Sequence, residues 1–212
     1  MNASNLELSC EDCMALMARY PDKHFDLAVV DPPYGINITD NKSGMGRRCG
    51  DLKASYKMGD WDNEPPTEEY FKELRRVAKN QIIWGANYFI DRMAWRSPCW
   101  LIWDKMYPNE VTFAAVEMAW ASFSTTAKKF TCHPCQLNRI HPTQKPVKLY
   151  NWLLKNYAKP GQKILDTHLG SGSHAIAAHY AGVHLTACEI DRDYFQAATE
   201  RIERETAQLT MI

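Results

Sequence analysis

Residues 25–34 read Phe-Asp-Leu-Ala-Val-Val-Asp-Pro-Pro-Tyr, and this stretch decides the class of fold. Its first six residues are apolar apart from Asp26, which predicts a strand buried within a sheet. Two consecutive prolines follow, and because proline has no backbone N–H the strand must end at Asp31. In α/β proteins the carboxyl ends of buried strands are where ligands bind, so the sequence predicts a functional site at this strand end.

The rest of the chain alternates between apolar strands and helices, an order that predicts an α/β domain with a mostly parallel sheet. The long stretches 36–66 and 124–146 lack a clear period and are expected to be loops. We expect helices at residues 14–20, from about Thr67, at 148–158, at 173–181 and at 194–209, and strands at 25–30, 81–85, 100–103, about 113–122, 163–166 and 185–189.

Length and charge point to one domain with a local basic surface. The chain has 212 residues, 45% of them hydrophobic, which suffices for one core, so we expect a single domain over residues 1–212. A formal net charge of zero argues against a surface that is basic all round. Lys and Arg are nevertheless concentrated between Lys128 and Lys148, where no acid occurs. This predicts a basic patch, with an ordinary solvated face as the alternative.

The cysteines and the hydropathy pattern predict the cellular compartment of the protein. Seven cysteines at irregular spacing, without a signal peptide, predict a protein of a reducing cytoplasm. No apolar run approaches the roughly 18 residues that cross a membrane, so no membrane partner is expected.

A glycine turn marks a second strand end. Residues 163–166 form a predicted strand, and Gly170 and Gly172 follow it before a helix. Glycine allows a backbone to approach a ligand closely. Glu189 stands at the end of the next strand, where an acid accepts hydrogen bonds from ribose hydroxyls. Since Ala175 stands where a dinucleotide motif needs its third glycine, the layout predicts another adenosine-containing ligand, with a purely structural turn as the alternative.

The stretch Asp31–Tyr34 suits chemistry on an exocyclic amine of a nucleobase. Such an amine is a poor nucleophile because its lone pair is delocalised into the ring. The Asp31 carboxylate and the Pro32 carbonyl can accept its two hydrogens, and Tyr34 offers a stacking face worth ~1–3 kcal/mol to a flipped base. Positioning and electrostatics then suffice without a covalent enzyme intermediate. The alternative is a proline turn with Tyr34 in the core.

Together these motifs resemble the β class of DNA amino-methyltransferases. In that circularly permuted family the catalytic loop, here Asp31–Tyr34, precedes the cofactor turn, here residues 166–173. The resemblance covers nearly the whole chain. It implies a Rossmann-like S-adenosylmethionine-dependent methyltransferase fold, with a mostly parallel seven-stranded sheet and helices on both faces. The catalytic residues that it implies are Asp31, Pro32, Pro33 and Tyr34.

The resemblance also implies S-adenosylmethionine as the cofactor. Residues 11–13 look like the element that contacts the cofactor's adenine, 82–89 like the support of the target-base pocket, and 141–146 like the segment beside the methionine end. His168 is a departure, because the family usually has Phe there. The cofactor-binding residues that the resemblance implies are Asp12, Cys13, Asp31, Lys145, Asp166, His168, Gly170, Ser171, Gly172, Ser173, Glu189 and Ile190.

Asp at the head of the catalytic loop is the pattern associated with adenine N6, whereas cytosine N4 enzymes more often carry Ser. The resemblance therefore predicts a site-specific methyltransferase acting on adenine N6 of a flipped-out base in double-stranded DNA. Cytosine N4 methylation and a module that binds DNA or cofactor without catalysis are the alternatives, and RNA or protein acceptors are less favoured. Loop 36–66 and segment 124–140 are the expected recognition elements, with DNA contacts from Arg47, Arg48, Lys128, Lys129 and Arg139.

A DNA-binding protein of this size is compatible with a homodimer and with a bacterial or phage-encoded enzyme. The sequence gives no signal for or against a restriction endonuclease partner. Two other interpretations are weaker. Cys135 follows a proline, as does the nucleophile of cytosine-C5 enzymes, but no buried strand precedes it. The pairs Cys10/Cys13 and Cys132/Cys135 are too far apart in the sequence to favour zinc, so no metal is expected.

Overall fold

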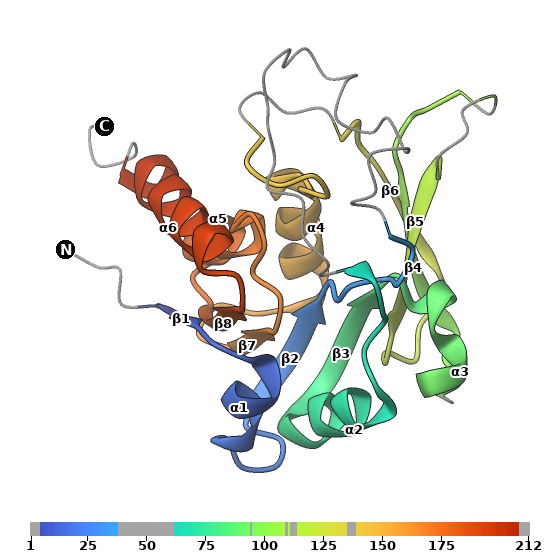
Figure 1. Ribbon diagram of the computed structural model, residues 1–212. Coiled ribbons are helices and arrows are strands. Elements are labelled where there is room, and N and C mark those ends of the chain that lie inside the picture. Colours follow the sequence, from blue (N-terminus) through green and yellow to red (C-terminus); the bar gives the residue numbers. More distant parts are fainter. Residues whose placement is uncertain are drawn as a thin grey trace.

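The computed structural model describes residues 5–37, 62–93, 95–108, 110, 114–134 and 139–207. Over these residues the chain forms one sheet with helices on both faces (Figure 1). The strands are β1 (Leu6–Cys10), β2 (Phe25–Val30), β3 (Ala78–Trp84), β4 (Cys99–Asp104), β5 (Val116–Ala121), β6 (Lys128–Thr131), β7 (Lys163–Asp166) and β8 (His184–Glu189). The helices are α1 (Cys13–Ala18), α2 (Glu68–Val77), α3 (Ile90–Met93), α4 (Val147–Tyr157), α5 (Ser173–Ala181) and α6 (Arg192–Ala207), with a short 3-10 helix, η3 (Ala86–Tyr88).

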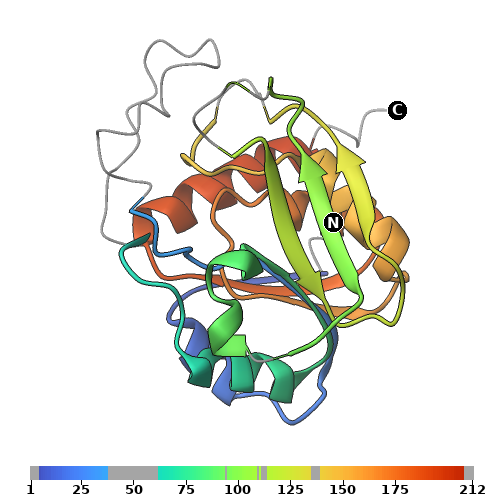
Figure 2. The same ribbon diagram turned by 90° about the vertical axis from the view of Figure 1, so that its right-hand side faces the viewer.

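The strand order in the sheet is β1-β8-β7-β2-β3-β5-β4-β6. Neighbouring strands run parallel, except that β5 is antiparallel to both β3 and β4. Figure 2 shows β5, β4 and β6 side by side at one end of the sheet. The predicted α/β class with a mostly parallel sheet and helices on both faces is confirmed.

The expected number of seven strands is wrong, because the described residues form eight. Neither β1 nor β6 was predicted, and β6 lies within the stretch 124–146 expected to be a loop. Both strands lie at the edges of the sheet. An edge strand has one neighbour and is partly solvated, so it lacks the apolar run that reveals a central strand. Lys128 and Lys129 in β6 are both exposed, as this explanation requires.

Strand β2 lies at the centre of the sheet and is buried on both faces. Leu27 and Val29 pack into the core that contains α4, α5 and α6. Ala28 and Val30 point to the opposite face and pack, together with Phe25 at the start of the strand, into the core that contains α1 and α2. This alternation explains why the strand reads as a continuous apolar run. A side chain placed directly after β2 is therefore held on a rigid element.

Three strand ends meet at one edge of the sheet. Strand β7 lies between β2 and β8 and runs parallel to both. Parallel neighbours end at the same edge, so Asp31 after β2, Asp166 at the end of β7 and Glu189 at the end of β8 are brought together. Within the described part of the chain, no helix is long and apolar enough to span a membrane.

Candidate active site

A cavity of about 260 Å³ opens at this edge of the sheet. All the residues predicted to bind the cofactor border the cavity, except Asp166 and Gly172. The residues lining it are Glu11, Asp12, Cys13, Asp31, Pro33, His141, Thr143, Gln144, Lys145, Tyr150, Thr167, His168, Leu169, Gly170, Ser171, Ser173, Glu189, Ile190, Asp191 and Tyr194. The cavity thus collects five of the sequence segments that the motifs singled out, namely 11–13, 31–34, 141–146, 166–173 and 189–190.

Glu189 connects the end of β8 to the glycine turn. Its Oε2 accepts a hydrogen bond from Gly170 N at 3.0 Å, and its Oε1 accepts one from Asp191 N at 3.0 Å. Burial raises the pKa of Glu189, and these backbone donors offset part of that effect. A carboxylate has about four acceptor positions, so lone pairs are left for a ligand in the cavity.

Asp166 and Gly172 lie behind the wall of the cavity. The buried Asp166 carboxylate accepts a hydrogen bond from His168 N at 3.0 Å and contacts His174 Nδ1 at 2.8 Å, so it fixes the first half of the turn. Gly172 has φ +74°, and a Cβ there would lie 2.8 Å from Ile202 Cδ1 of α6. Both residues shape the turn from within, and direct contact with a cofactor stays a prediction for each.

His168 lines the cavity at the position where the resemblance predicts Phe. Its ring meets Tyr70 edge-on with centroids 5.7 Å apart, and its Nδ1 lies 2.9 Å from Thr167 Oγ1. Burial lowers the pKa of His168 to about 4, so the ring is neutral at pH 7. A neutral flat imidazole can take over much of the packing role of a phenyl ring.

The acidic element before α1 also lines the cavity. Asp12 is the N-cap of α1, and its Oδ1 accepts hydrogen bonds from Met14 N at 2.9 Å and Ala15 N at 3.1 Å. Burial, and then the charge of Asp12, raise the pKa of the Cys13 thiol to about 11. Cys13 therefore lines the cavity as a neutral thiol and is not activated for redox chemistry.

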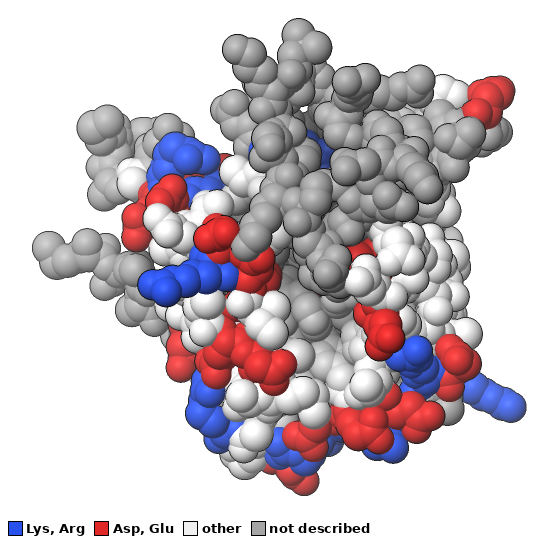
Figure 3. Space-filling model, in the orientation of Figure 1, with Lys and Arg blue, Asp and Glu red and all other residues white. Residues whose placement is uncertain are grey.

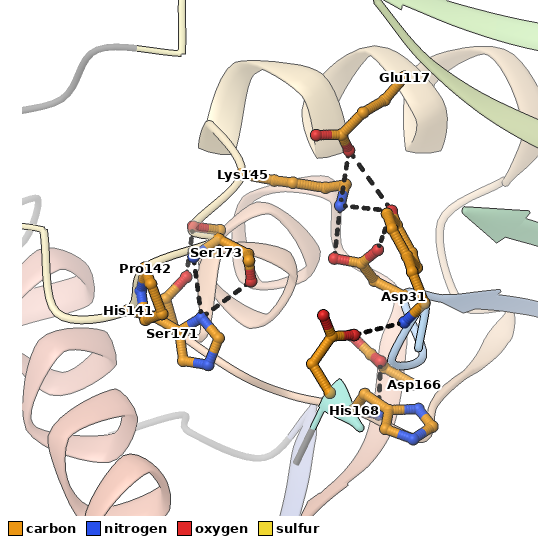
Figure 4. Close-up of polar contacts among 12 residues, drawn as sticks. Asp31, Glu117, His141, Pro142, Lys145, Asp166, His168, Ser171 and Ser173 are labelled. Atoms are coloured by element: carbon orange, nitrogen blue, oxygen red, sulfur yellow. Dashed lines mark hydrogen bonds and ion pairs between the residues drawn. The ribbon is translucent and has the colours of Figure 1, made fainter. Parts of the chain in front are cut away.

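The predicted catalytic loop brings Asp31 to the rim of the cavity (Figure 4). Asp31 Oδ2 accepts a hydrogen bond from Lys145 Nζ at 2.5 Å, and Oδ1 accepts one from the Tyr34 hydroxyl at 2.8 Å. Pro33 also lines the cavity, while Pro32 is buried. Behind the loop, the buried Asp62 accepts hydrogen bonds from the backbone N–H groups of Tyr34 at 2.7 Å and of Gly35 at 3.1 Å. The loop is thus held from both sides.

The Tyr34 ring rests on the segment after β3, within residues 82–89. It stacks on Tyr88 of η3 with centroids 5.1 Å apart and an interplanar angle of 18°. Its edge lies against Gly85, where φ is +71° and a Cβ would be 2.1 Å from Tyr34 Cε1. Only a residue without a side chain leaves room for the tyrosine in this position.

Two charged residues of the site were not predicted. Glu117 Oε2 lies 3.0 Å from Lys145 Nζ, and Glu117 Oε1 lies 2.6 Å from Lys105 Nζ. Burial would raise the pKa of Glu117, but Lys145 and Lys105 outweigh it and lower that pKa to about 2. For Asp31, burial raises the pKa and the charge of Lys145 opposes it. The sequence signal available was a single acid, Glu117, within the otherwise uncharged strand β5.

Lys145 was predicted to bind the cofactor, and it does border the cavity. Its ammonium has three hydrogens, which match three acceptors: Asp31 Oδ2, Glu117 Oε2 at 3.0 Å and the Tyr34 hydroxyl at 3.2 Å. The nearby charges of Asp31 and Glu117 raise the pKa of Lys145 against the effect of burial, which is the largest single influence and acts to lower it. Lys145 is therefore built primarily into the catalytic loop.

The predicted DNA contacts fall partly outside the described residues, namely Arg47, Arg48 and the rest of 38–61, together with 135–138 of segment 124–140. Lys128 and Lys129 are exposed on β6, where Lys129 Nζ lies 3.2 Å from Asp104. Arg139 is half-buried and donates a hydrogen bond to the Pro142 carbonyl. In Figure 3 the described Lys and Arg side chains on the visible face are interspersed with Asp and Glu. Such mixed charge agrees with a protein that attracts DNA phosphates at a local patch and not over its whole surface.

Cys135 lies outside the described residues. Cys132 has a free thiol. Within the ranges that the structure covers, no group of three or more His, Cys, Asp or Glu side chains is placed to hold a metal ion.

Solved structures support the fold. The M1.HpyAVI–S-adenosylmethionine complex superposes with a TM-score of 0.61 at 16% identity, covering 93% of this chain and 98% of that one. A DNA modification methylase of Thermus thermophilus, TTHA0409, gives 0.62 at 18% identity, covering 97% and 96%. The cytosine-N4-specific PvuII DNA methyltransferase gives 0.63 at 13% identity, covering 96% and 91%.

Sequence comparison gives the family. The methylase YubD of Escherichia coli (strain K12) is 27% identical over 207 residues, covering 90% of this chain and 87% of the relative. The type II methyltransferase M2.DpnII of Streptococcus pneumoniae is 22% identical over 251 residues, covering 96% and 92%. The model of the N6/N4 methyltransferase family, described as DNA methylase, matches residues 91–200, which is more than half of the chain. The chain therefore belongs to the N6/N4 DNA methylase family.

Proposed function

We propose that this chain is a site-specific DNA methyltransferase that transfers a methyl group from S-adenosylmethionine to adenine N6 of a flipped-out base. The observation that carries the proposal is the position of Asp31. Its carboxylate borders the cavity and also belongs to the buried charged cluster with Lys145. A methyl donor in the cavity and an amine on Asp31 would therefore meet at one point.

The lining of the cavity fits the proposed cofactor. Glu189 and Asp12 can accept hydrogen bonds from hydroxyl and amine groups, while His168 and Ile190 offer flat or apolar surface near them. The hydroxyls of Ser171 and Ser173, which lie 3.2 Å apart, provide donors at the turn. When bound, S-adenosylmethionine supplies a methyl group on a sulfonium. The protein's part is to orient the donor and to keep water away from it.

The loop residues act on the amine. The Asp31 carboxylate can accept one amine hydrogen, and the Pro32 carbonyl, in a loop with two fixed φ angles, can accept the other. Both bonds favour a tetrahedral nitrogen, which restores its lone pair for attack. Tyr34 presents a ring on which the flipped base can stack. In the structure the Tyr34 hydroxyl already donates a hydrogen bond to Asp31 Oδ1. An incoming amine would therefore share that acceptor or displace the hydroxyl from it.

Adenine N6 is proposed because Asp31, rather than Ser, heads the loop. Cytosine N4 is the other acceptor in this family, and a module without catalysis is the third candidate. Against that third candidate, Asp31, Tyr34 and Glu189 are present together and converge on the same site.

We also propose that residues 1–212 act as one domain, with loop 36–66 and segment 124–140 reading double-stranded DNA. Exposed Lys128 and Lys129 support this for the second element. Homodimerisation, which would double the DNA surface covered, belongs to the same proposal.

Single-molecule sequencing of genomic DNA from cells that express the protein tests the proposal. The expected result is N6-methyladenine at one recurring sequence motif, absent from cells that express Asp31→Ala. N4-methylcytosine at a recurring motif would instead identify cytosine N4 as the acceptor. Unmodified DNA, together with cofactor binding by the purified protein, would contradict a methyltransferase and favour the inactive module.

A further inference from the structure

The charged cluster under the catalytic loop contains two carboxylates and two ammonium groups, Asp31, Glu117, Lys145 and Lys105. Three contacts join them in a row: Asp31 to Lys145 at 2.5 Å, Lys145 to Glu117 at 3.0 Å, and Glu117 to Lys105 at 2.6 Å. Each side chain is less than one-fifth exposed, and Lys145 is 3% exposed. Removing one partner from such a buried row leaves another charge uncompensated, so the four groups act as a unit.

Glu117 is within reach of both groups that hold Asp31. The Tyr34 hydroxyl, which donates to Asp31 Oδ1, lies 3.4 Å from Glu117 Oε2. The Lys145 ammonium, which donates to Asp31 Oδ2, lies 3.0 Å from the same oxygen. A single carboxylate oxygen thus offers a second acceptor to each of Asp31's two donors. Figure 4 shows Lys145 extending between Asp31 and Glu117.

This arrangement matters when a target amine arrives. The amine needs a lone pair on Asp31, and the donors already present must be shared or moved. A buried donor that loses its acceptor is destabilising, and more so if it is charged. With Glu117 in place, the Tyr34 hydroxyl finds another acceptor when it leaves Asp31, and the Lys145 ammonium keeps the charged partner that it already has.

Resting on the proposed function, we infer that Glu117, backed by Lys105, is a positioning residue that receives the Tyr34 hydroxyl, keeps the Lys145 ammonium paired and so frees Asp31 to bind the target amine. Lys105 holds the second oxygen of Glu117 and keeps this carboxylate an acceptor. The two residues come from adjacent antiparallel strands: Glu117 is in β5 opposite Trp103 of β4, and Lys105 directly follows β4. Glu117 itself touches neither methyl donor nor amine.

The role of Glu117 makes a directional prediction about Asp31. The charged and titratable groups that face Asp31 are Lys145, Glu117 and Tyr34. Tyr150 of α4 is also close enough for the charge of Asp31 to help raise the pKa of this tyrosine. Glu117 is a like charge and helps to raise the pKa of Asp31. Replacing Glu117 by Gln removes that effect, so Asp31 should titrate at lower pH. The shift reports the electrostatic contact between Glu117 and Asp31, and a fall in the single-turnover rate with folding and cofactor affinity retained reports the positioning role.

The test compares wild type, Glu117→Gln, Glu117→Asp and the control Glu73→Gln. Glu73 forms an ion pair with Arg76 on α2, away from the cavity, and is also partly buried. Two measurements are made: the single-turnover rate of methyl transfer against pH, and the titration of the Asp31 carboxyl carbon by NMR. Cofactor affinity is measured by calorimetry in each variant.

For Glu117→Gln we expect the plateau rate to fall about tenfold or more, cofactor affinity to stay within about threefold, and both the acid limb and the Asp31 titration to move to lower pH. Glu117→Asp keeps the charge but shortens the reach, so its rate should fall while Asp31 titrates near the wild-type pH. If Glu117→Gln does not fold, the rate of Glu117→Asp provides the test. Glu73→Gln should match wild type in both measurements.

An unchanged rate or an unchanged Asp31 titration in Glu117→Gln would overturn the inference; if that variant does not fold, a wild-type rate in Glu117→Asp would do so. A wild-type protein that methylates nothing would instead contradict the proposed function. The two failures are distinguishable, because the NMR titration of Asp31 needs neither DNA nor turnover.

Discussion

The Cα of Gly85 faces the edge of the Tyr34 ring so closely that a Cβ would lie 2.1 Å from Tyr34 Cε1. The glycine also has φ +71°, a conformation that other residues adopt only with strain. The two residues belong to different segments, the catalytic loop after β2 and the turn after β3. Glycine at position 85 therefore determines where the proposed stacking ring can sit.

Gly85→Ala should displace Tyr34 and strongly reduce methyl transfer while cofactor affinity changes little. The control is Gly161→Ala, since Gly161 has φ +79° and nothing within 4 Å of an added Cβ. Both variants carry backbone strain of about 1–3 kcal/mol, but only Gly85→Ala carries the clash. Thermal unfolding and single-turnover assays measure the two effects. Equal losses of activity in both variants would contradict a specific role for Gly85.

Asp31→Ala should lower the rate of methyl transfer about 100-fold or more, because it removes an acceptor for the target amine. Cofactor affinity should remain nearly intact, since Asp31 is one of many residues that line the cavity. The measurement pairs a single-turnover assay with calorimetry. Retained turnover would remove Asp31 from the proposed mechanism.

Glu189→Ala should weaken the cofactor affinity measured by calorimetry. A hydrogen bond to a charged group contributes about 1.5–3 kcal/mol, which corresponds to a loss of about tenfold to a hundredfold. Part of the loss will come from the turn, because Glu189 also binds Gly170 N. Glu203→Gln serves as a control, because Glu203 is exposed on α6 and does not line the cavity. Unchanged affinity in Glu189→Ala would contradict the proposed contact with ribose hydroxyls.

His168 should make stability fall in mild acid. Its folded pKa is lowered to about 4 by burial, below the value of about 6.5 for an unfolded histidine. The unfolded chain therefore binds more protons, and stability decreases as the pH falls from about 6.5 towards 4. His168→Phe should lose less thermal stability between pH 7.5 and pH 5 than wild type, whereas the exposed control His184→Gln should behave as wild type. An equal loss in His168→Phe would contradict this assignment.

The sequence predicted the central elements well because they are buried. Strands β2 and β7 and helix α5 begin and end at the predicted residues, and the cavity collects the motifs that follow those strands. The edge strands β1 and β6 were missed for want of an apolar signature. Glu117 and Lys105 were missed for another reason. Their role arises from pairing across two antiparallel strands and from contact with Lys145, and neither relation leaves a local pattern in the sequence.

Lys128 and Lys129 should contribute affinity for DNA without contributing sequence preference. Both are exposed on the edge strand β6, and Lys129 has a salt bridge to Asp104 that phosphate can replace. If each contacts one phosphate, the double variant Lys128→Ala/Lys129→Ala should weaken binding to all duplexes alike. The slope of log K against log salt concentration should become shallower by about 2. Fluorescence anisotropy over a range of salt measures this slope, with exposed Lys155→Ala on α4 as the control. An unchanged slope would place the phosphate contacts elsewhere on the molecule.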